Sequence, residues 1–417
     1  MRNKILLLIV CLTQSVLFAS GGSIYTRLGL GELNYNFSAR RFGLGELGYA
    51  LSDREFLSYA NPASWNQIGL TKFETGIMIN SVTQSSSSTS VFNSNSYYTG
   101  LVVGFPISRE NGISFAGGIV PYSNVGYDLI ADEKSTLVDP HKTSYKGDGG
   151  IFKIFFGTSY RLPFDFSLGA SFDYYNGKIN NTTSVAFEDS SDFRDATFRR
   201  EFSYHGIGAT LGLISSDLSK LFGESDFKDF RIGLSFSPQV NLSSDSTNTF
   251  TSLIGDYEYN SGVTKTKLPY RLGVGASFKL TDNYLFVLDY LHQPMSELSW
   301  GGIKTTQMQD ISKYSFGVEY RPSYNSTGFW KQVMLRGGAS YENTPYVFNG
   351  TSVNQLSVYA GLSLPLDFER AGFTNTIDIG FQYGRRGTTD NKLIQENIYK
   401  FYITINFGEL WFIPTER

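Results

Sequence analysis

The stretch Tyr399-Lys-Phe-Tyr-Ile-Thr-Ile-Asn-Phe407 decides the fold, because apolar residues occupy every second position and most residues between them are polar. Successive side chains of a β-strand point to opposite faces, so this period of two predicts a strand with one apolar and one polar face. The same alternation recurs over residues 377–383 and 314–320. Repeated segments of this kind are typical of a transmembrane β-barrel in a bacterial outer membrane.

Fourteen segments satisfy the strand criteria, and an even number is expected of a single-chain bacterial barrel. They are residues 70–81, 96–106, 112–122, 149–161, 165–178, 197–215, 229–240, 267–280, 284–292, 313–322, 331–341, 353–364, 374–385 and 396–407. Connections that follow odd-numbered strands are mostly the longer ones, as expected for extracellular loops that alternate with periplasmic turns. We therefore predict an all-β, 14-stranded antiparallel transmembrane β-barrel over residues 68–417. A secreted β-sandwich or β-propeller is the alternative.

The first residues resemble a secretory signal peptide. Arg2 and Lys4 precede an apolar run over residues 5–18, and small residues follow at 19–22. We predict a signal peptide over residues 1–20. The chain's single cysteine, Cys11, lies within it, so no disulfide framework is expected. No later segment has the roughly 18 consecutive apolar residues of a membrane-spanning helix.

The composition argues against several classes of function. A net charge of −3 without a basic cluster gives no nucleic-acid footprint. Only three histidines are present, and no Gly-x-Ser-x-Gly elbow occurs. We therefore predict neither an enzyme nor a metal or cofactor site. The Ser/Thr/Asn-rich segments 84–90 and 241–251 are predicted to be exposed extracellular turns.

Residues 21–67 lack strand alternation and contain the near-repeat Gly29-Leu-Gly-Glu-Leu33 and Gly43-Leu-Gly-Glu-Leu47. Glycines let backbones approach closely, so we predict that this segment folds into the barrel as a luminal plug. A disordered periplasmic tail is the alternative. Because the strand number is even, both termini are expected on the periplasmic side.

The motif Tyr59-Ala-Asn-Pro-Ala-Ser64, placed just before the first strand, resembles the FadL/TodX family of outer-membrane transporters for hydrophobic compounds. Later strands resemble that family as well, and residues 24–33 and Trp411-Phe412 are similar to its Bacteroidetes-type branch. These strand segments are residues 267–275, 316–322, 335–346 and 381–387. The resemblance implies passive uptake of hydrophobic small molecules such as long-chain fatty acids, with outer-membrane lipid around the barrel.

Within this resemblance, Asn61, Pro62 and Ala63 form the joint between plug and barrel and are candidate gating residues. Gly117, Gly118 and Pro121 interrupt the third strand, because proline has no N–H for the ladder and paired glycines weaken a strand. In the FadL/TodX family a kink in the third strand opens the barrel wall sideways. An ordinary bulge near the rim is the alternative.

Inward-facing positions supply the remaining candidates. The ninth strand is apolar on both faces, and Leu285, Val287 and Leu291 are candidate residues of a ligand path. Charged residues of both signs are predicted to face the lumen and to pair across it and with the plug. They are Lys153, Asp173, Arg231, Arg271, Lys279, Asp289, Glu319, Arg321, Arg336 and Asp378. An alternative function is that of an outer-membrane partner or shuttle protein in a type IX-like protein secretion system.

Overall fold

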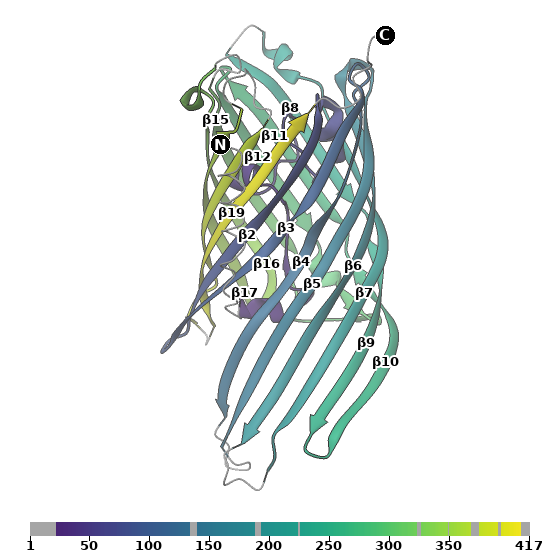
Figure 1. The fold of residues 1–417 in the computed structure, drawn as a ribbon, viewed down its shortest axis with the longest axis vertical. Helices are drawn as coiled ribbons and strands as arrows, with labels where there is room; N and C mark the ends of the chain where they lie inside the picture. Colours follow the sequence, from purple (N-terminus) through teal and green to yellow (C-terminus); the bar gives the residue numbers. More distant parts are fainter. Residues whose placement is uncertain are drawn as a thin grey trace.

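The computed structural model describes residues 22–133, 140–187, 193–223, 226–322, 327–348, 350–367, 375–390 and 393–409. The predicted signal peptide, Cys11 and Trp411-Phe412 lie outside these residues. Within them, every pair of neighbouring strands in the barrel wall is antiparallel, and β19 (Gln395–Glu409) pairs with β2 (Thr71–Ser85) to close the ring. The chain therefore forms a closed barrel (Figure 1).

Fourteen strands make the wall among the described residues, as predicted. Between β2 and β19 they are β3 (Ser90–Ser108), β4 (Ile113–Glu133), β5 (His141–Arg161), β6 (Ser167–Phe187), β7 (Ala196–Ile214), β8 (Phe227–Ser237) continued by β9 (Val240–Ser252), β10 (Gly255–Leu268) continued by β11 (Arg271–Leu280), β12 (Tyr284–Gln293), β15 (Ile311–Tyr320), β16 (Met334–Phe348), β17 (Thr351–Pro365) and β18 (Thr376–Arg386). The two-residue strands β13 (Ser299–Trp300) and β14 (Ile303–Lys304) form a small hairpin after β12.

The alternating side chains that predicted the fold point to the expected faces of the wall, apolar ones outward and polar ones inward. In β19, Tyr399, Phe401 and Phe407 are exposed on the outside, whereas Tyr402 and Thr404 are buried inside. Apolar side chains on the outer face suit lipid, and buried polar ones suit a filled lumen. This is the fold of an outer-membrane β-barrel.

The two ends of the barrel differ. Short turns lie at one end and include η3 (Pro163–Asp165), η4 (Leu218–Phe222) and η6 (Phe329–Lys331); η5 (Met295–Glu297) follows β12 at the other end. At that other end, β4 to β7 and β9–β10 reach far beyond the remaining strands (Figure 1). The prediction of turns over 241–251 was wrong, because these residues form β9 and pair with β7 and β10. Since short turns are periplasmic in bacterial barrels, the long hairpins lie outside the cell.

The N-terminal segment runs through the lumen from one end to the other. It contains η1 (Ile24–Arg27), β1 (Glu32–Leu33), α2 (Ala39–Gly43) and η2 (Pro62–Gln67), and nearly all of its residues are buried. Ser23 contacts Glu396 near the extracellular end, so the expectation of a periplasmic N-terminus is wrong for the first described residues. No helix in the described part of the chain is long and apolar enough to cross a membrane.

Candidate functional site

A buried cluster of charges fixes the middle of the plug to the wall. The Arg40 guanidinium donates to both carboxylate oxygens of Glu319, over 2.9 and 3.0 Å, and also contacts Asp53. Arg336 reaches Glu319 at 2.5 Å, and Arg321 reaches Asp53 at 2.9 Å. Because Arg40 and Glu319 are both inaccessible to solvent, each needs buried counter-ions: Arg40 has Glu319 and Asp53, and Glu319 also has Arg321 and Arg336.

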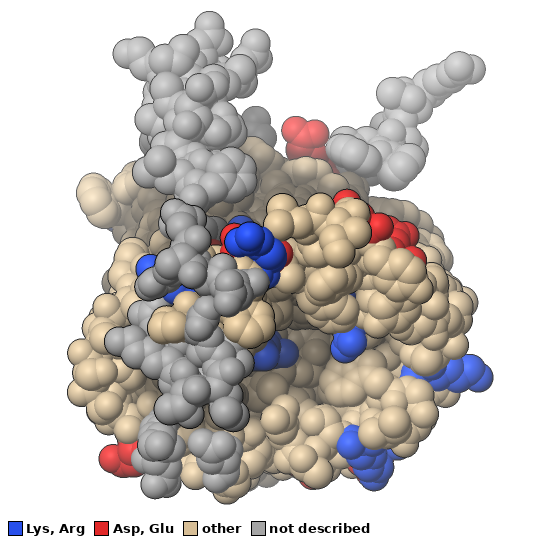
Figure 2. Space-filling view, turned by 90° about the horizontal axis from the view of Figure 1, so that it is seen from below, with Lys and Arg blue, Asp and Glu red and all other residues tan. Residues whose placement is uncertain are grey.

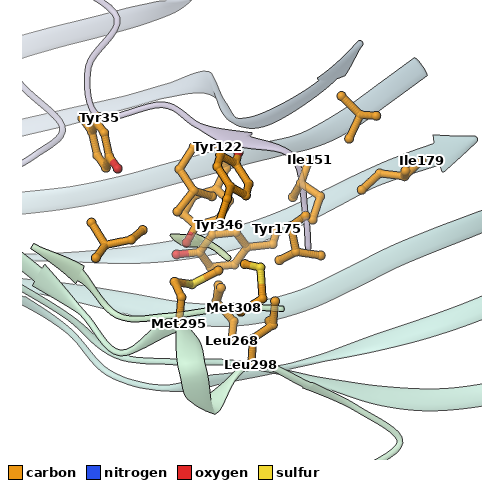
Figure 3. Packing of buried hydrophobic residues seen from close by; sticks show 14 of the residues in the cluster. Tyr35, Tyr122, Ile151, Tyr175, Ile179, Leu268, Met295, Leu298, Met308 and Tyr346 are labelled. Atoms are coloured by element: carbon orange, nitrogen blue, oxygen red, sulfur yellow. The ribbon is translucent and has the colours of Figure 1, made fainter. Parts of the chain in front are cut away.

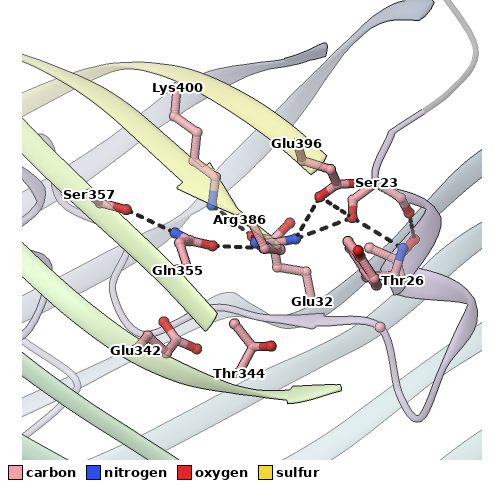
Figure 4. Close-up of polar contacts among 12 residues, drawn as sticks. Ser23, Thr26, Glu32, Glu342, Thr344, Gln355, Ser357, Arg386, Glu396 and Lys400 are labelled. Carbon is pink, nitrogen blue, oxygen red and sulfur yellow. Dashed lines mark hydrogen bonds and ion pairs between the residues drawn. The ribbon is translucent and has the colours of Figure 1, made fainter. Parts of the chain in front are cut away.

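The near-repeat of the plug places one carboxylate at each of two further cation sites. Gly31 and Gly45 both have positive φ, of 87° and 89°, and each turns the chain so that the following glutamate meets the wall. Glu32 lies 2.8 Å from Arg386 and 3.1 Å from Lys400 (Figure 4). Burial opposes ionisation of Glu32, but these two cations hold its pKa at about 2.

Glu46, the equivalent residue of the second repeat, contacts Lys313, which also lies 3.1 Å from Glu342. Asp289 accepts hydrogen bonds from the backbone N–H groups of Gly48 and Tyr49. The prediction that inward charges pair across the lumen and with the plug is therefore confirmed at these positions, and at Lys153–Asp173 within the wall. The individual partners were not foreseen.

The joint residues hold the plug against β6, β7 and β8. Asn61 is fully buried: its side-chain oxygen accepts from the N–H of Ala63, and its amide donates to the carbonyl of Tyr49 at 2.7 Å. Pro62 begins η2. Wall glycines make room for this turn, since a Cβ on Gly212 would lie 2.0 Å from the Asn61 oxygen. The motif thus forms a rigid connection between plug and wall.

The hydrogen-bonded ladder between β3 and β4 ends partway along the two strands, and this gap in the pairing is called the opening below. The two strands pair from Ser108 with Ile113 up to Leu101 with Ile119, and their pairing ends there. Both strands bulge at this level. In β3, Thr99 lies between the residues paired with Ile77 and Gly76, and in β4, Tyr122 lies between the residues paired with β5. The parts of the two strands that do not pair with each other are Ser90–Gly100 of β3 and residues 120–133 of β4, and their hairpins diverge in Figure 1.

The periplasmic edge of this opening contains Gly117, Gly118 and Pro121. Gly117 and Gly118 are still paired with β3 and β5, so the prediction that they interrupt the strand was wrong. A Cβ on Gly118 would lie 2.3 Å from the carbonyl oxygen of Leu101. Glycine is therefore needed here because β3 and β4 pack closely at this position. Pro121 sits at the bulge, beyond the last β3 pair, where a missing N–H costs no ladder bond.

The plug occupies the inner side of the opening. Glu32 and Leu33 of β1 pair antiparallel with Asn124 and Ser123 of β4. Farther along the same edge, the Thr26 hydroxyl donates to the carbonyl of Gly126 and accepts from its N–H. Plug residues therefore form hydrogen bonds along the edge of β4 that does not pair with β3, as far as Gly126.

An apolar and aromatic core fills the extracellular half of the lumen. Plug residues such as Leu30 and Tyr35 pack there with wall residues such as Tyr122, Tyr175 and Tyr346 (Figure 3). The predicted ligand-path residues do face the lumen, but the plug covers them. Leu285 and Val287 pack on Leu44 and Leu51, and Leu291 belongs to the larger core.

Among the described residues, two of the cavities beside the plug are large enough to matter for a ligand. One, of about 290 Å³, opens at the extracellular mouth between the plug and the β13–β14 hairpin. Its lining includes Leu28, Val125, Ile179, Phe202, Tyr204, Trp300 and Met308, with Arg27 and Asn181 as polar groups. The other, of about 720 Å³, lies at the periplasmic end and is lined by charged residues such as Arg54, Arg109 and Lys220. The mouth cavity was not anticipated, since its lining comes from segments distant in sequence.

Seen from the end reached by the long hairpins, the described surface is mostly uncharged, and Lys and Arg side chains appear in its hollow and on its rim (Figure 2). The mouth cavity has an aromatic extension toward this end. Phe198 is the cross-strand partner of Phe250, which in turn is the partner of Tyr257, and partners share a face. Phe202, two positions from Tyr204 and four from Phe198, continues this row into the cavity.

The closed fourteen-stranded barrel is similar in fold to solved structures of FadL/TodX-like outer-membrane channels. A Pseudomonas aeruginosa FadL homologue matches with a TM-score of 0.60 and 10% identity over 90% of this chain and 99% of that one. The Pseudomonas putida toluene transporter TodX matches with a TM-score of 0.58 and 15% identity, covering 92% of this chain and 100% of that one. The CymD monoaromatic hydrocarbon channel gives 0.53 and 15%, covering 95% and 100%.

At identities of 10–15%, the likeness to these solved structures shows a shared fold only. The family model described as BamG matches residues 1–416, so the chain belongs to the BamG family. No curated protein matches.

Proposed function

We propose that this protein is a passive outer-membrane channel for hydrophobic small molecules, which leave the barrel sideways into the lipid. The observation that carries the proposal is the opening between β3 and β4, where both strands bulge and stop pairing next to an apolar mouth cavity. Val125 of β4 lines that cavity, so the cavity and the opening share a strand. A lateral route avoids the charged periplasmic end of the lumen.

Capture begins outside the membrane. The aromatic row of Phe198, Phe250 and Tyr257 offers apolar area that leads to Phe202 and Tyr204 at the cavity. Aromatic rings combine large contact area with low conformational cost, so they suit transient contact with an apolar solute. Withdrawal of β1 and Thr26 from β4 then connects the cavity with the wall opening.

The cavity suggests the size of the substrate. A volume of about 290 Å³ lies just below the ~300–1,000 Å³ range of ligand pockets. This favours compact apolar molecules. A long-chain fatty acid is the elongated alternative, and it would need a larger displacement of the plug.

A disulfide lock tests the route. Leu33 and Ser123 are directly opposite in the β1–β4 pair, and the only cysteine of the chain is Cys11. Leu33→Cys with Ser123→Cys should form a bond that keeps β1 in the opening. Oxidation should abolish uptake of the fluorescent hydrophobic probe N-phenylnaphthylamine, and a reductant should restore it.

The matched control is Ser85→Cys with Ser90→Cys, opposite residues of β2 and β3 whose hydroxyl oxygens lie 3.1 Å apart. This bond leaves plug and β4 free and should not affect uptake. Uptake at the wild-type rate in the oxidised Leu33–Ser123 variant would refute the lateral route. The mouth cavity has its own test: Trp300→Ala should weaken saturable probe binding, whereas Trp330→Ala, on a periplasmic turn, should not.

The second candidate function, a partner protein in secretion, is favoured by a different observation. The plug fills the lumen, and among the described residues the mouth and periplasmic cavities share no lining residue, so these two cavities do not form a continuous apolar tunnel. A protein that serves as a partner has no need for such a tunnel. It would keep its cellular role in the oxidised Leu33–Ser123 variant, whereas a channel would lose it.

A further inference from the structure

We infer that the outer edge of β10 is a docking site for an extended segment of another polypeptide, with basic and apolar side chains, added as one more strand. The inference does not depend on transport. It starts from the backbone: Gly255–Leu268 pairs with β9 on one side, and on the other side only Thr266 and Lys267 pair, with β13. Within the part of the chain that the structure describes, no strand lies beside the edge over residues 255–264.

This edge lies outside the membrane. β11, which continues β10 toward the periplasm, has 10 residues, close to the roughly 9–11 that one crossing by a tilted strand needs. Both faces of β10 are exposed from Gly255 to Lys265. The β9–β10 hairpin projects beyond the barrel in Figure 1. Lipid therefore does not account for its apolar side chains.

Exposed apolar side chains lie at the tip of the hairpin and farther along β10. Ile254 is fully exposed, Leu253 is 77% exposed, and Tyr257 and Val263 are 67% and 70% exposed. Contiguous exposed apolar groups mark interaction sites in folded proteins. An unpaired strand edge with apolar alternate positions is the arrangement that recognises an extended peptide by strand addition.

The charges on β10 determine which peptide strands can pair with its edge. Asp256 and Glu258 share one face of β10 and are exposed, and among the described residues neither carboxylate forms an ion pair. Charged residues and a bulge, here between Asn260 and Val263, hinder indiscriminate pairing at an edge. A segment that presents Lys or Arg opposite the two acids complements them, so the occupant is basic as well as apolar.

A second copy of this chain does not fit the edge. Copies in one membrane point the same way, so their β10 strands would run parallel. A two-fold axis along the membrane normal would then bring the same edge of both strands together. Neighbouring parallel strands pair through opposite edges, so the partner is a different polypeptide.

The test uses the full barrel in detergent and a labelled ten-residue peptide of alternating Lys and Val. We expect saturable binding by fluorescence anisotropy, together with slowed hydrogen exchange of amides within 255–264. Asp256→Lys with Glu258→Lys should weaken binding roughly tenfold, as expected for the loss of two exposed ion pairs. Glu110→Lys with Asp282→Lys, an equal charge change on periplasmic turns, should leave binding unchanged.

Two further peptides make the outcome decisive. The same peptide with every backbone nitrogen methylated keeps its side chains but cannot donate to β10, and it should not bind. A peptide of alternating Glu and Val should not bind either. Equal binding of the methylated peptide, binding without protection of the β10 amides, binding insensitive to the Asp256/Glu258 change, or no binding of the Lys–Val peptide would each overturn the proposal.

Discussion

Replacement of Arg40 by methionine should release the plug while leaving the barrel closed. Methionine keeps much of the volume of the arginine stem but removes the plug's own cation from the cluster, although Arg321 still contacts Asp53 and Glu319, and Arg336 still contacts Glu319. The two hydrogen bonds lost between Arg40 and Glu319 go to a charged group, and each is worth about 1.5–3 kcal/mol. At about 1.4 kcal/mol per factor of ten, opening of the plug should become at least roughly 100-fold more frequent.

Amide hydrogen exchange measures this directly. Residues 22–67 should exchange faster in Arg40→Met, whereas the β19–β2 seam should be unaffected because its ladder does not involve the plug. Arg199→Met is the matched control: Arg199 is half-exposed and lies 3.7 Å from Glu201, and such pairs are worth about 0–1 kcal/mol. Unchanged plug exchange in a folded Arg40→Met barrel would refute the assignment of the central charge cluster as the main anchor.

Three further predictions follow from the same contacts. Acid should loosen the extracellular part of the plug. The folded-state pKa of Glu32 is depressed to about 2, so the stabilisation from its ion pairs is present above the ordinary pKa of 4.5 and is lost as pH falls toward 2. Amide hydrogen exchange of the plug at a series of pH values would show this loss. Gly212→Ala should strain the joint, because its Cβ would meet the buried asparagine, and overpacking costs about 1–3 kcal/mol; Gly69→Ala, with open space around it, should be neutral in the same unfolding titration. Ile403→Arg should destabilise the barrel by about 2–4 kcal/mol, whereas Ile130→Arg on the extracellular extension should cost little, and equal urea midpoints would contradict this facing.

The barrel could be predicted from the sequence because the membrane imposes a simple rule on every strand. Lipid outside and a polar, plugged interior produce the alternation seen at Phe401 and Tyr402. That rule weakens outside the membrane. The segment 241–251 was assigned to a turn because it is rich in Ser, Thr and Asn, yet its backbone pairs on both sides as β9.

The sequence allowed us to predict that a plug exists but not which wall residues it contacts. Its Gly-Leu-Gly-Glu repeat was visible, and a tight glycine turn before an acid was a signal that each glutamate meets a cation. The cations themselves, such as Arg386 for Glu32 and Lys313 for Glu46, lie hundreds of residues away, and pairing across a closed lumen leaves no local trace. A lateral opening at the third strand stays a prediction; what the structure adds is that β3–β4 pairing ends where both strands bulge.

The central claim, lateral exit between β3 and β4, is tested most directly by a crystal structure with bromobenzene, whose bromine scatters anomalously. The account predicts bromine peaks in the mouth cavity beside Trp300 and between β3 and β4 near Tyr122. Peaks confined to the charged periplasmic cavity, or no peak inside the barrel wall at saturating ligand, would contradict it.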